Sequence, residues 1–259
     1  MSDSSYTTQL GAGLGMIEEN IRFLQLWEPG DSVSELHQNA LNSGSFPDVS
    51  ARRLRNLVAE MFAPRFLVEN AKPAIHLKQL LDCLPQRAVS QLVYLYTCRA
   101  QRILHDFITE LYWPKYESGN PLFTRQEVLE FITSAMDSGK MKKRWSENLV
   151  KRVAGYLGGC CIDFGLAERI PPGSYSITPI YLISDVFLYI VHDLRFRKCS
   201  DHELIHHEDW KLWGMSPSDV FQQLQMSSRD GHFIVQGGVE LTRITWKYNS
   251  MEEALDAVA

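Results

Sequence analysis

The sequence lacks the cysteine spacing of a disulfide framework, and it has no C-x-x-C motif. An odd number of cysteines without paired spacing is typical of a protein that stays reduced, because disulfide frameworks belong to oxidising compartments. Two of the cysteines are adjacent, so a helix would direct them to different sides. The five are Cys83, Cys98, Cys160, Cys161 and Cys199. This pattern predicts a cytoplasmic protein with free thiols.

The sequence also lacks segments for secretion or membrane insertion. The first ten residues, MSDSSYTTQL, have no basic region followed by an apolar core, so we expect no signal peptide. The most apolar run, Ile180 to Val191, is interrupted by Asp185 and is too short to cross about 30 Å of hydrocarbon. We therefore expect no membrane among the partners of this protein.

Positive net charge is absent as well. The 259 residues carry a net charge of −5, and a protein that coats nucleic acid non-specifically is usually positive overall. Hydrophobic residues make up 45% of the chain, which excludes a disordered protein. The length allows one large domain or two modest ones. Any interaction with nucleic acid must therefore depend on local clusters of charge.

Catalytic motifs are scarce. G-x-S-x-G and P-loop motifs are missing. The glycine pattern from Gly11 to Gly15 precedes a predicted helix, but no strand precedes it, so we interpret it as a flexible entry to that helix rather than a phosphate loop. The sequence predicts a protein that is not an enzyme and has no cofactor.

One metal-binding motif is present, the H-E-x-x-H pentad from His202 to His206. In zinc proteases this spacing places two imidazoles one helical turn apart, with the glutamate as general base. No third ligand follows at the usual distance, and acidic neighbours such as Asp201 and Asp209 replace the apolar face that holds the motif in a core. We therefore interpret the pentad as a solvated face and predict no metal site. A zinc-dependent hydrolase remains an alternative.

Helical periodicity dominates the chain, and Lys115 to Pro121 is the best candidate boundary between domains at residues 1–114 and 115–259. We expect a third helix, capped by Asp48 or Ser50 and ended or kinked by Pro64, and a long helix that ends before Trp113-Pro114. Predicted helices cover residues 14–27, about 32–41, 48–64, 74–84, 87–111, 124–136, 145–164, 181–194, 201–206, 217–226 and 251–258. Predicted strands cover residues 175–178 and a hairpin at 233–235 and 239–246.

Two predicted helices carry clusters of basic residues. Arg52, Arg53 and Arg55 lie in the first turns of the third helix, where the helix dipole favours anions over cations. An external phosphate would resolve this conflict. A solvated basic face, or ion pairs to Glu18, Glu19 or Glu35, would explain the cluster equally well.

The second cluster precedes and enters the helix that begins near Trp145. Residues 140–152 carry a net charge of +5. We predict that an apolar stripe from Trp145 to Phe164 is buried, and that Gly155, Gly158 and Gly159 leave a strip that another backbone can approach. The basic residues of this cluster are Lys140, Lys142, Lys143, Arg144, Lys151 and Arg152.

Each basic helix follows another helix and a loop, which is the outline of a helix-turn-helix DNA reader. The usual turn has about three or four residues, and both loops here are longer. We predict a mainly α fold class: a globular helical bundle with two helix-turn-helix-like units and a minor C-terminal β-hairpin. A protein partner with an acidic face is the alternative ligand for these surfaces.

Short motifs in this chain resemble the BrxA family in the right order over nearly the whole length. Near the start they are Tyr6-Thr7-Thr8, Leu10, Ala12-Gly13 and Glu18-Glu19, followed by Asn39, Leu41, Ser50, Arg52 and Arg65-Phe66. The later motifs are Trp145-Ser146-Glu147, Arg152-Val153-Ala154, Asp163-Phe164-Gly165-Leu166 and Asp209-Trp210.

The resemblance implies a small, helical, non-enzymatic DNA-binding component of a bacteriophage-exclusion (BREX) defence system. Its partners would be double-stranded DNA and other BREX proteins, including a methyltransferase, and we expect a monomer in isolation. The family supplies no set of DNA-contacting residues, so the two basic clusters are the candidates. An adaptor that binds only other BREX proteins is the competing hypothesis.

Overall fold

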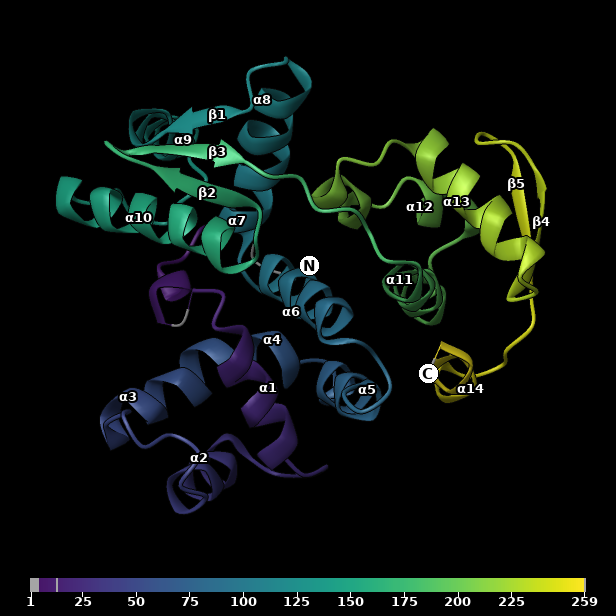
Figure 1. Cartoon of the computed structure of the whole chain (residues 1–259), viewed down its shortest axis with the longest axis horizontal. Coiled ribbons are helices and arrows are strands. Elements are labelled where there is room, and N and C mark those ends of the chain that lie inside the picture. Colours follow the sequence, from purple (N-terminus) through teal and green to yellow (C-terminus); the bar gives the residue numbers. More distant parts are fainter. Residues whose placement is uncertain (1–4, 13, 259) are drawn as a thin grey trace.

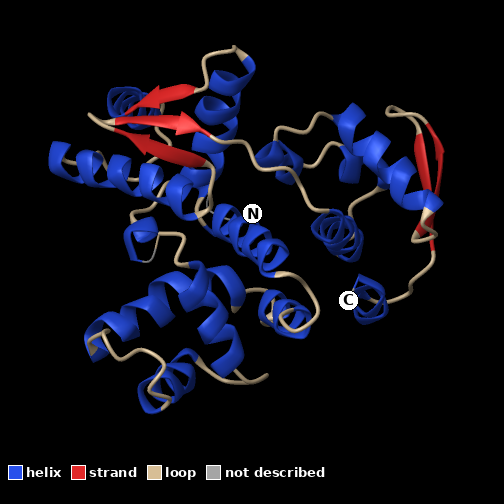
Figure 2. Cartoon of the chain, viewed as in Figure 1, coloured by secondary structure: helices blue, strands red, loops and turns tan. Residues whose placement is uncertain are grey.

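The structure is a computed structural model that describes residues 5–12 and 14–258. It is mainly α-helical, with one three-stranded and one two-stranded antiparallel sheet, so the predicted fold class is confirmed. Figure 1 shows three groups of elements that follow one another along the chain, and Figure 2 shows that the two sheets belong to the second and third groups.

The first group is entirely helical. Its second helix begins at a capping box between Ser32 and Glu35, and Ser50 caps the third by accepting a hydrogen bond from the amide of Arg53. After the short η1 (Gln9–Ala12), its elements are α1 (Ile17–Leu26), α2 (Val33–Asn42), α3 (Ala51–Asn56), η2 (Leu57–Phe62), α4 (Ala63–Phe66) and α5 (Lys72–Leu80).

The second group contains a long helix, three short helical segments, two further helices and a small sheet. In the sheet, β3 lies between β1 and β2, and Ser176 is paired with Leu122 on one side and Glu168 on the other. The helices are α6 (Gln86–Ala100), α7 (Arg102–Phe107), η3 (Ile108–Tyr112), α8 (Trp113–Glu117), α9 (Arg125–Asp137) and α10 (Glu147–Asp163). The strands are β1 (Leu122–Thr124), β2 (Ala167–Ile170) and β3 (Ser174–Ile177).

The third group completes the fold with an apolar helix and a hairpin. Its last helix packs against α5 of the first group, so the C-terminus returns to the N-terminal part of the molecule. The elements are α11 (Ser184–Phe196), α12 (Asp201–Ile205), η4 (Glu208–Trp213), α13 (Pro217–Arg229), β4 (Phe233–Gly237), β5 (Thr242–Trp246) and α14 (Met251–Val258).

Two prolines lie inside helical rods rather than at their ends. The prediction that a helix stops before Trp113-Pro114 is wrong, because α8 runs through Pro114 to Glu117. Helix α4 also continues past Pro64 to Phe66, so of the two outcomes predicted for Pro64, an end of the helix is wrong. Each proline follows a π-helical segment, in which the amides of Ala63 and Trp113 bond to carbonyls five residues earlier. The wider π turn leaves room for the proline ring and tolerates its missing amide donor, which would otherwise interrupt the helical rod.

Other departures concern α6 and the sheet. The single helix expected at residues 87–111 is interrupted at Gln101, whose φ of −124° and ψ of 85° are not helical. Strands β1 and β2 were not expected, because each has only three or four residues with little alternation in burial. The strand at residues 174–177 and the C-terminal hairpin are confirmed.

Buried apolar side chains form one continuous core that includes residues from Tyr6 to Leu255. The predicted domain boundary after residue 114 falls within α8, whose Trp113 is part of that core. Among the described helices, none has the length and apolarity needed to cross a membrane.

Candidate nucleic-acid interface

Helix α10 presents one polar face to solvent. Ser146 caps it by accepting a hydrogen bond from the amide of Leu149. Val150, Val153 and Leu157 are buried, whereas Leu149 is only partly buried. The buried stripe therefore lies beside the predicted one: Val153, Cys160 and Phe164 are in the core, but Trp145, Leu149 and Tyr156 are at its edge. The outward face carries Asn148, Lys151 and Arg152.

The glycines of α10 have different surroundings. A side chain at Gly158 would collide with the ring of Tyr175, since an added Cβ would lie 2.5 Å from its hydroxyl oxygen. Gly159 faces Leu14, and Gly155 faces open space. The atoms nearest to Gly158 and Gly159 belong to side chains of β3 and the N-terminal segment, so the predicted approach of another backbone to these glycines is wrong.

The β2–β3 hairpin follows α10 directly and lies beside it (Figure 1). Arg125 links the two, because its amide donates to the carbonyl of Gly173 in the hairpin turn at 2.9 Å and its guanidinium donates to the carbonyl of Lys151 at 3.4 Å. Arg169 projects from β2, exposed, with its guanidinium 6.0 Å from the centre of the Tyr175 ring. The structure thus adds two arginines to the basic surface of α10.

Sequence reasoning missed Arg125 and Arg169 because neither belongs to a run of basic residues. Arg125 directly follows Thr124, the N-cap of α9. The signal that could have found Arg169 was the strand predicted at residues 175–178, because its hairpin partner had to come from the residues just before it.

Lys140 is half-buried and forms ion pairs with two carboxylates of the second group. Its ammonium group lies 2.9 Å from Asp106 and 2.8 Å from Glu110, and its backbone carbonyl accepts a hydrogen bond from the amide of Tyr6. Burial opposes ionisation of Asp106, but hydrogen bonds from His105, Tyr6 and Lys140 outweigh it and lower the pKa of that carboxyl below its usual range. Lys140 therefore serves the fold, and we leave it out of the candidate interface.

The other residues of the second cluster lie on the surface. Lys142, Lys143 and Arg144 are exposed in the loop between α9 and α10, and Arg144 pairs with Asp137 at 2.9 Å. Both members of that pair are more than half exposed, so it is a weak contact that a phosphate can replace.

The first cluster is also on the surface. Arg52, Arg53 and Arg55 are exposed at the start of α3, and in the described part of the chain their side chains form no hydrogen bond or ion pair. Two of the proposed acidic partners are used elsewhere: Glu18 pairs with Arg22, and Glu35 accepts from the amide of Ser32. The conflict between these cations and the helix dipole is therefore not relieved within the chain.

The two basic helices face the same way. In Figure 1 the N-terminal ends of α3 and α10 and the turn between β2 and β3 all point to the left of the view. The N-terminal segment joins the two groups: Arg65 of α4 donates to the carbonyls of Leu14 and Gly15, and the amide of Gly15 donates to Asp163 at 3.0 Å.

These contacts also explain the glycine pattern from Gly11 to Gly15, of which Gly13 lies outside the described residues. The ring of Tyr156 covers Gly11, and the amide of Gly15 already has a carboxylate partner. A phosphate loop needs free amides, so this segment serves as a joint in the fold.

A model of the BrxA family matches residues 4–193. The chain belongs to the BrxA family. The family is associated with BREX phage defence, so this BrxA protein has a BREX-associated role. A comparison with curated proteins gives no match. The crystal structure of an uncharacterized protein from Magnetospirillum magneticum is similar, with a TM-score of 0.59 and 15% identity, over 80% of this chain and 97% of that one. At that identity the likeness concerns the fold alone.

Several residues that carry the resemblance to BrxA lie at joints of the fold. Tyr6 bonds to Asp106, Arg65 holds the N-terminal segment, and Asp209 forms a 2.6 Å ion pair with Arg99. These residues fix the arrangement of the groups and are not on the basic surface.

Proposed function

We propose that this BrxA protein is a non-enzymatic component of BREX defence that binds duplex DNA through α10 and the β2–β3 hairpin. The observation that supports this most is the meeting of Lys151, Arg152 and Arg125 beside the hairpin turn, on the solvent face of the helix. The protein would act in the cytoplasm beside the methyltransferase and other BREX proteins.

The order of elements supports the proposal. Helices α7–α8, strand β1, helices α9 and α10, and the β2–β3 hairpin follow one another, with sheet order β1-β3-β2. This is the arrangement of winged helix-turn-helix domains, in which the second helix of the pair enters the major groove and the hairpin contacts the adjacent backbone. The loop from Ser138 to Ser146 is longer than the usual turn of about three or four residues, so the proposal concerns the winged variant of the motif.

The side chains on this face suit phosphate more than bases. Lys151, Arg152 and Arg169 supply positive charge, which positions a protein on DNA without reading its sequence. Asn148 is the one exposed amide in the first turn of α10, and an amide pairs well with adenine in the major groove. We expect mainly electrostatic binding with modest sequence preference.

A second contact would involve the start of α3. Arg52, Arg53 and Arg55 lie where the helix N-terminus and three cations both attract a phosphate. Because the starts of α3 and α10 point the same way, one duplex can meet both surfaces.

A titration of duplex DNA by fluorescence anisotropy tests the proposal. Wild-type affinity should fall steeply between about 50 and 200 mM salt, because bound protein releases counterions from phosphates. The double variant Lys151→Glu/Arg152→Glu should bind all sequences more weakly and show a salt slope smaller by about two. The matched control Lys211→Glu/Arg229→Glu changes the net charge equally on exposed residues of the third group and should bind as the wild type does.

Binding that is indifferent to salt, or an equal loss in the control variant, would contradict the proposal. Capture of BREX proteins by a chain with no affinity for DNA would instead favour the adaptor hypothesis. The same titration with Arg243→Glu, an exposed residue of β5, shows whether the C-terminal hairpin also contacts DNA.

A further inference from the structure

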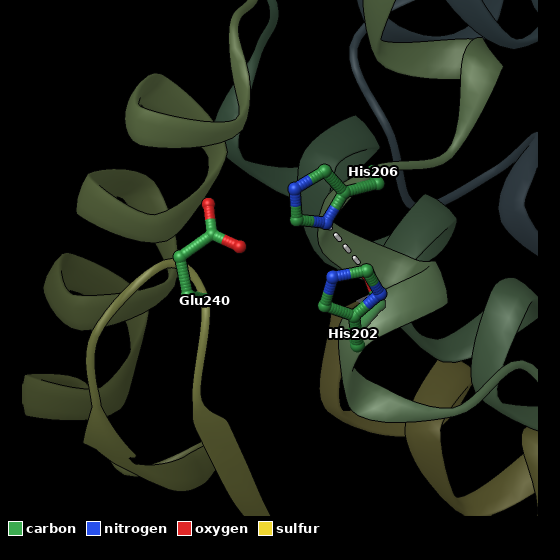
Figure 3. A group of neighbouring side chains, drawn as sticks. All are labelled: His202, His206 and Glu240. Carbon is green, nitrogen blue, oxygen red and sulfur yellow. Dashed lines mark hydrogen bonds between the residues drawn. The ribbon is translucent and has the colours of Figure 1, made fainter.

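The structure brings a third metal-binding side chain to the two histidines of the HELIH pentad. His202 lies in α12 and His206 directly follows it, while Glu240 comes from the turn between β4 and β5 (Figure 3). One donor atom from each residue lies within 4.8 Å of the other two. The sequence shows no third ligand at the usual distance after the pentad, because Glu240 lies in a hairpin that folds back over α12.

Independent contacts hold this arrangement in place. Asp201, the first residue of α12, accepts a hydrogen bond from the amide of Ile244 in β5 at 2.9 Å, which ties the hairpin to the helix. The turn itself is tight: Gly237 has a φ of +96°, and a Cβ there would lie 2.0 Å from the carbonyl oxygen of Leu241. The position of Glu240 above the histidines thus follows from the backbone.

The ring of His206 has the backbone hydrogen bond that metal-binding histidines usually have. Nδ1 of His206 lies 3.0 Å from the carbonyl oxygen of His202, so it carries the proton, and Nε2 is left with its lone pair directed outward. The ring of His202 stacks on that of His206 at 4.2 Å between centres, which keeps the two imidazoles on one side of the helix.

We propose that His202, His206 and Glu240 bind one divalent transition-metal ion of the Zn²⁺ type, which fastens the β4–β5 turn to α12. Two imidazoles and a carboxylate are donors that suit zinc. Donors around a tetrahedral zinc ion lie roughly 3.4 Å apart, so exposed side chains close the remaining distance by small rotations. Three protein ligands leave the fourth position to water.

The site is one of binding and not of hydrolysis. Glu203, the general base of the zinc-protease motif, accepts hydrogen bonds from both the amide and the hydroxyl of Ser200 at 2.8 Å. It closes the capping box of α12 and points toward the helix N-terminus. Glu240, and not Glu203, is therefore the carboxylate of this site.

Titration of untagged, chelator-treated protein with Zn²⁺ tests this proposal, with Co²⁺ as a spectroscopic probe of the coordination. We expect one ion per chain. His202→Gln, His206→Gln and Glu240→Gln should each lower the affinity at least about tenfold, because even changes in outer residues around a metal cost that much. Glu203→Gln is the matched control: glutamine preserves a capping box, so its affinity should equal that of the wild type.

Hydrogen exchange of the turn amides provides a second readout that does not depend on the titration. Zn²⁺ should slow exchange at residues 238–242 in the wild type and in Glu203→Gln, and leave it unchanged in Glu240→Gln. Binding well below one ion per chain overturns the proposal. So does an affinity that Glu240→Gln leaves intact, since the ion would then sit on the histidines without holding the hairpin.

Discussion

The ammonium group of Lys140 lies 2.9 Å from a carboxylate oxygen of Asp106, an aspartate that is only 3% exposed. Tyr6 donates its hydroxyl to the same oxygen. This cluster ties the N-terminal segment and the loop before α10 to α7. A lysine counted among the DNA-binding candidates is thus part of the structure that positions them.

Replacing Lys140 should therefore affect stability first. We expect Lys140→Gln to lower the free energy of unfolding by about 1–2 kcal/mol, because a buried carboxylate loses one of its partners while Arg102 and Tyr6 remain. Urea unfolding measures this loss. Lys143→Gln, on an exposed residue of the same loop, should stay within about 0.5 kcal/mol of the wild type. Equal stability of the two variants would contradict the structural role of Lys140.

The buried guanidinium of Arg65 gives a second prediction. Burial lowers the pKa of Arg65 to about 10, so it remains charged at neutral pH, and it donates to the backbone carbonyls of Leu14 and Gly15. Arg65→Ala leaves both carbonyls without that donor and opens a cavity, so we expect a loss of about 3 kcal/mol or more.

Arg55 provides the control for Arg65, because it lies on the same helical rod but is exposed. Arg55→Ala should change the free energy of unfolding by less than about 0.5 kcal/mol. A small effect at both positions would show that the joint between the N-terminal segment and α4 is not needed for stability.

Two glycines of α10 should respond in opposite directions to the same substitution. Gly158→Ala places a methyl group against the Tyr175 ring and should destabilise by about 1–3 kcal/mol. Gly155→Ala adds a methyl group in open space within a helix and should stabilise by about 0.5–1 kcal/mol. Thermal and urea unfolding check both, and a stabilising Gly158→Ala would show that β3 does not pack on α10 in this way.

His192 predicts a pH dependence of stability. It is buried on α11, and burial, with smaller effects of Arg195 and His232, lowers its pKa to about 4. Its folded-state pKa is below the unfolded value, so the unfolded chain binds the proton first as pH falls. This contribution to stability is complete above about pH 6.5 and is lost progressively toward pH 4, by roughly 3 kcal/mol.

The variant His192→Leu isolates this effect from other titrations. Neither ring nitrogen of His192 has a hydrogen-bond partner within the described residues, so leucine removes few polar contacts. As pH falls from about 6.5 to 4, the wild type should lose roughly 3 kcal/mol more of its free energy of unfolding than His192→Leu loses. Parallel curves would mean that His192 does not titrate in this range.

Local features of the fold were readable from the sequence, and long-range contacts were not. The cap of the third helix at Ser50 was predicted, as one of two candidates, because a cap and the amide it accepts from lie within one helical turn. The helical rods through Pro64 and Pro114 were not, since their π segments depend on packing along the whole rod.

The candidate sites show the same division. The exposed position of Lys151 followed from helical periodicity, but its contact with Arg125 joins two helices. Likewise, His202 and His206 were recognised by their spacing, whereas Glu240 approaches them only because β5 is tied to α12. Local spacing in the sequence does not indicate which distant residues come into contact.

In the proposed DNA-binding mode, the joint made by Arg65, Gly15 and Asp163 has a consequence for the shape of the duplex. It connects α10 to α4, which continues the helical rod that begins with α3, so in this mode the two basic helices would meet the duplex at a set spacing. The grooves of straight duplex repeat about every 34–36 Å. Where the groove repeat differs from the spacing of α3 and α10, the duplex must bend or twist to contact both helices. Preference among sequences would then come from flexible base steps at positions that the protein never touches.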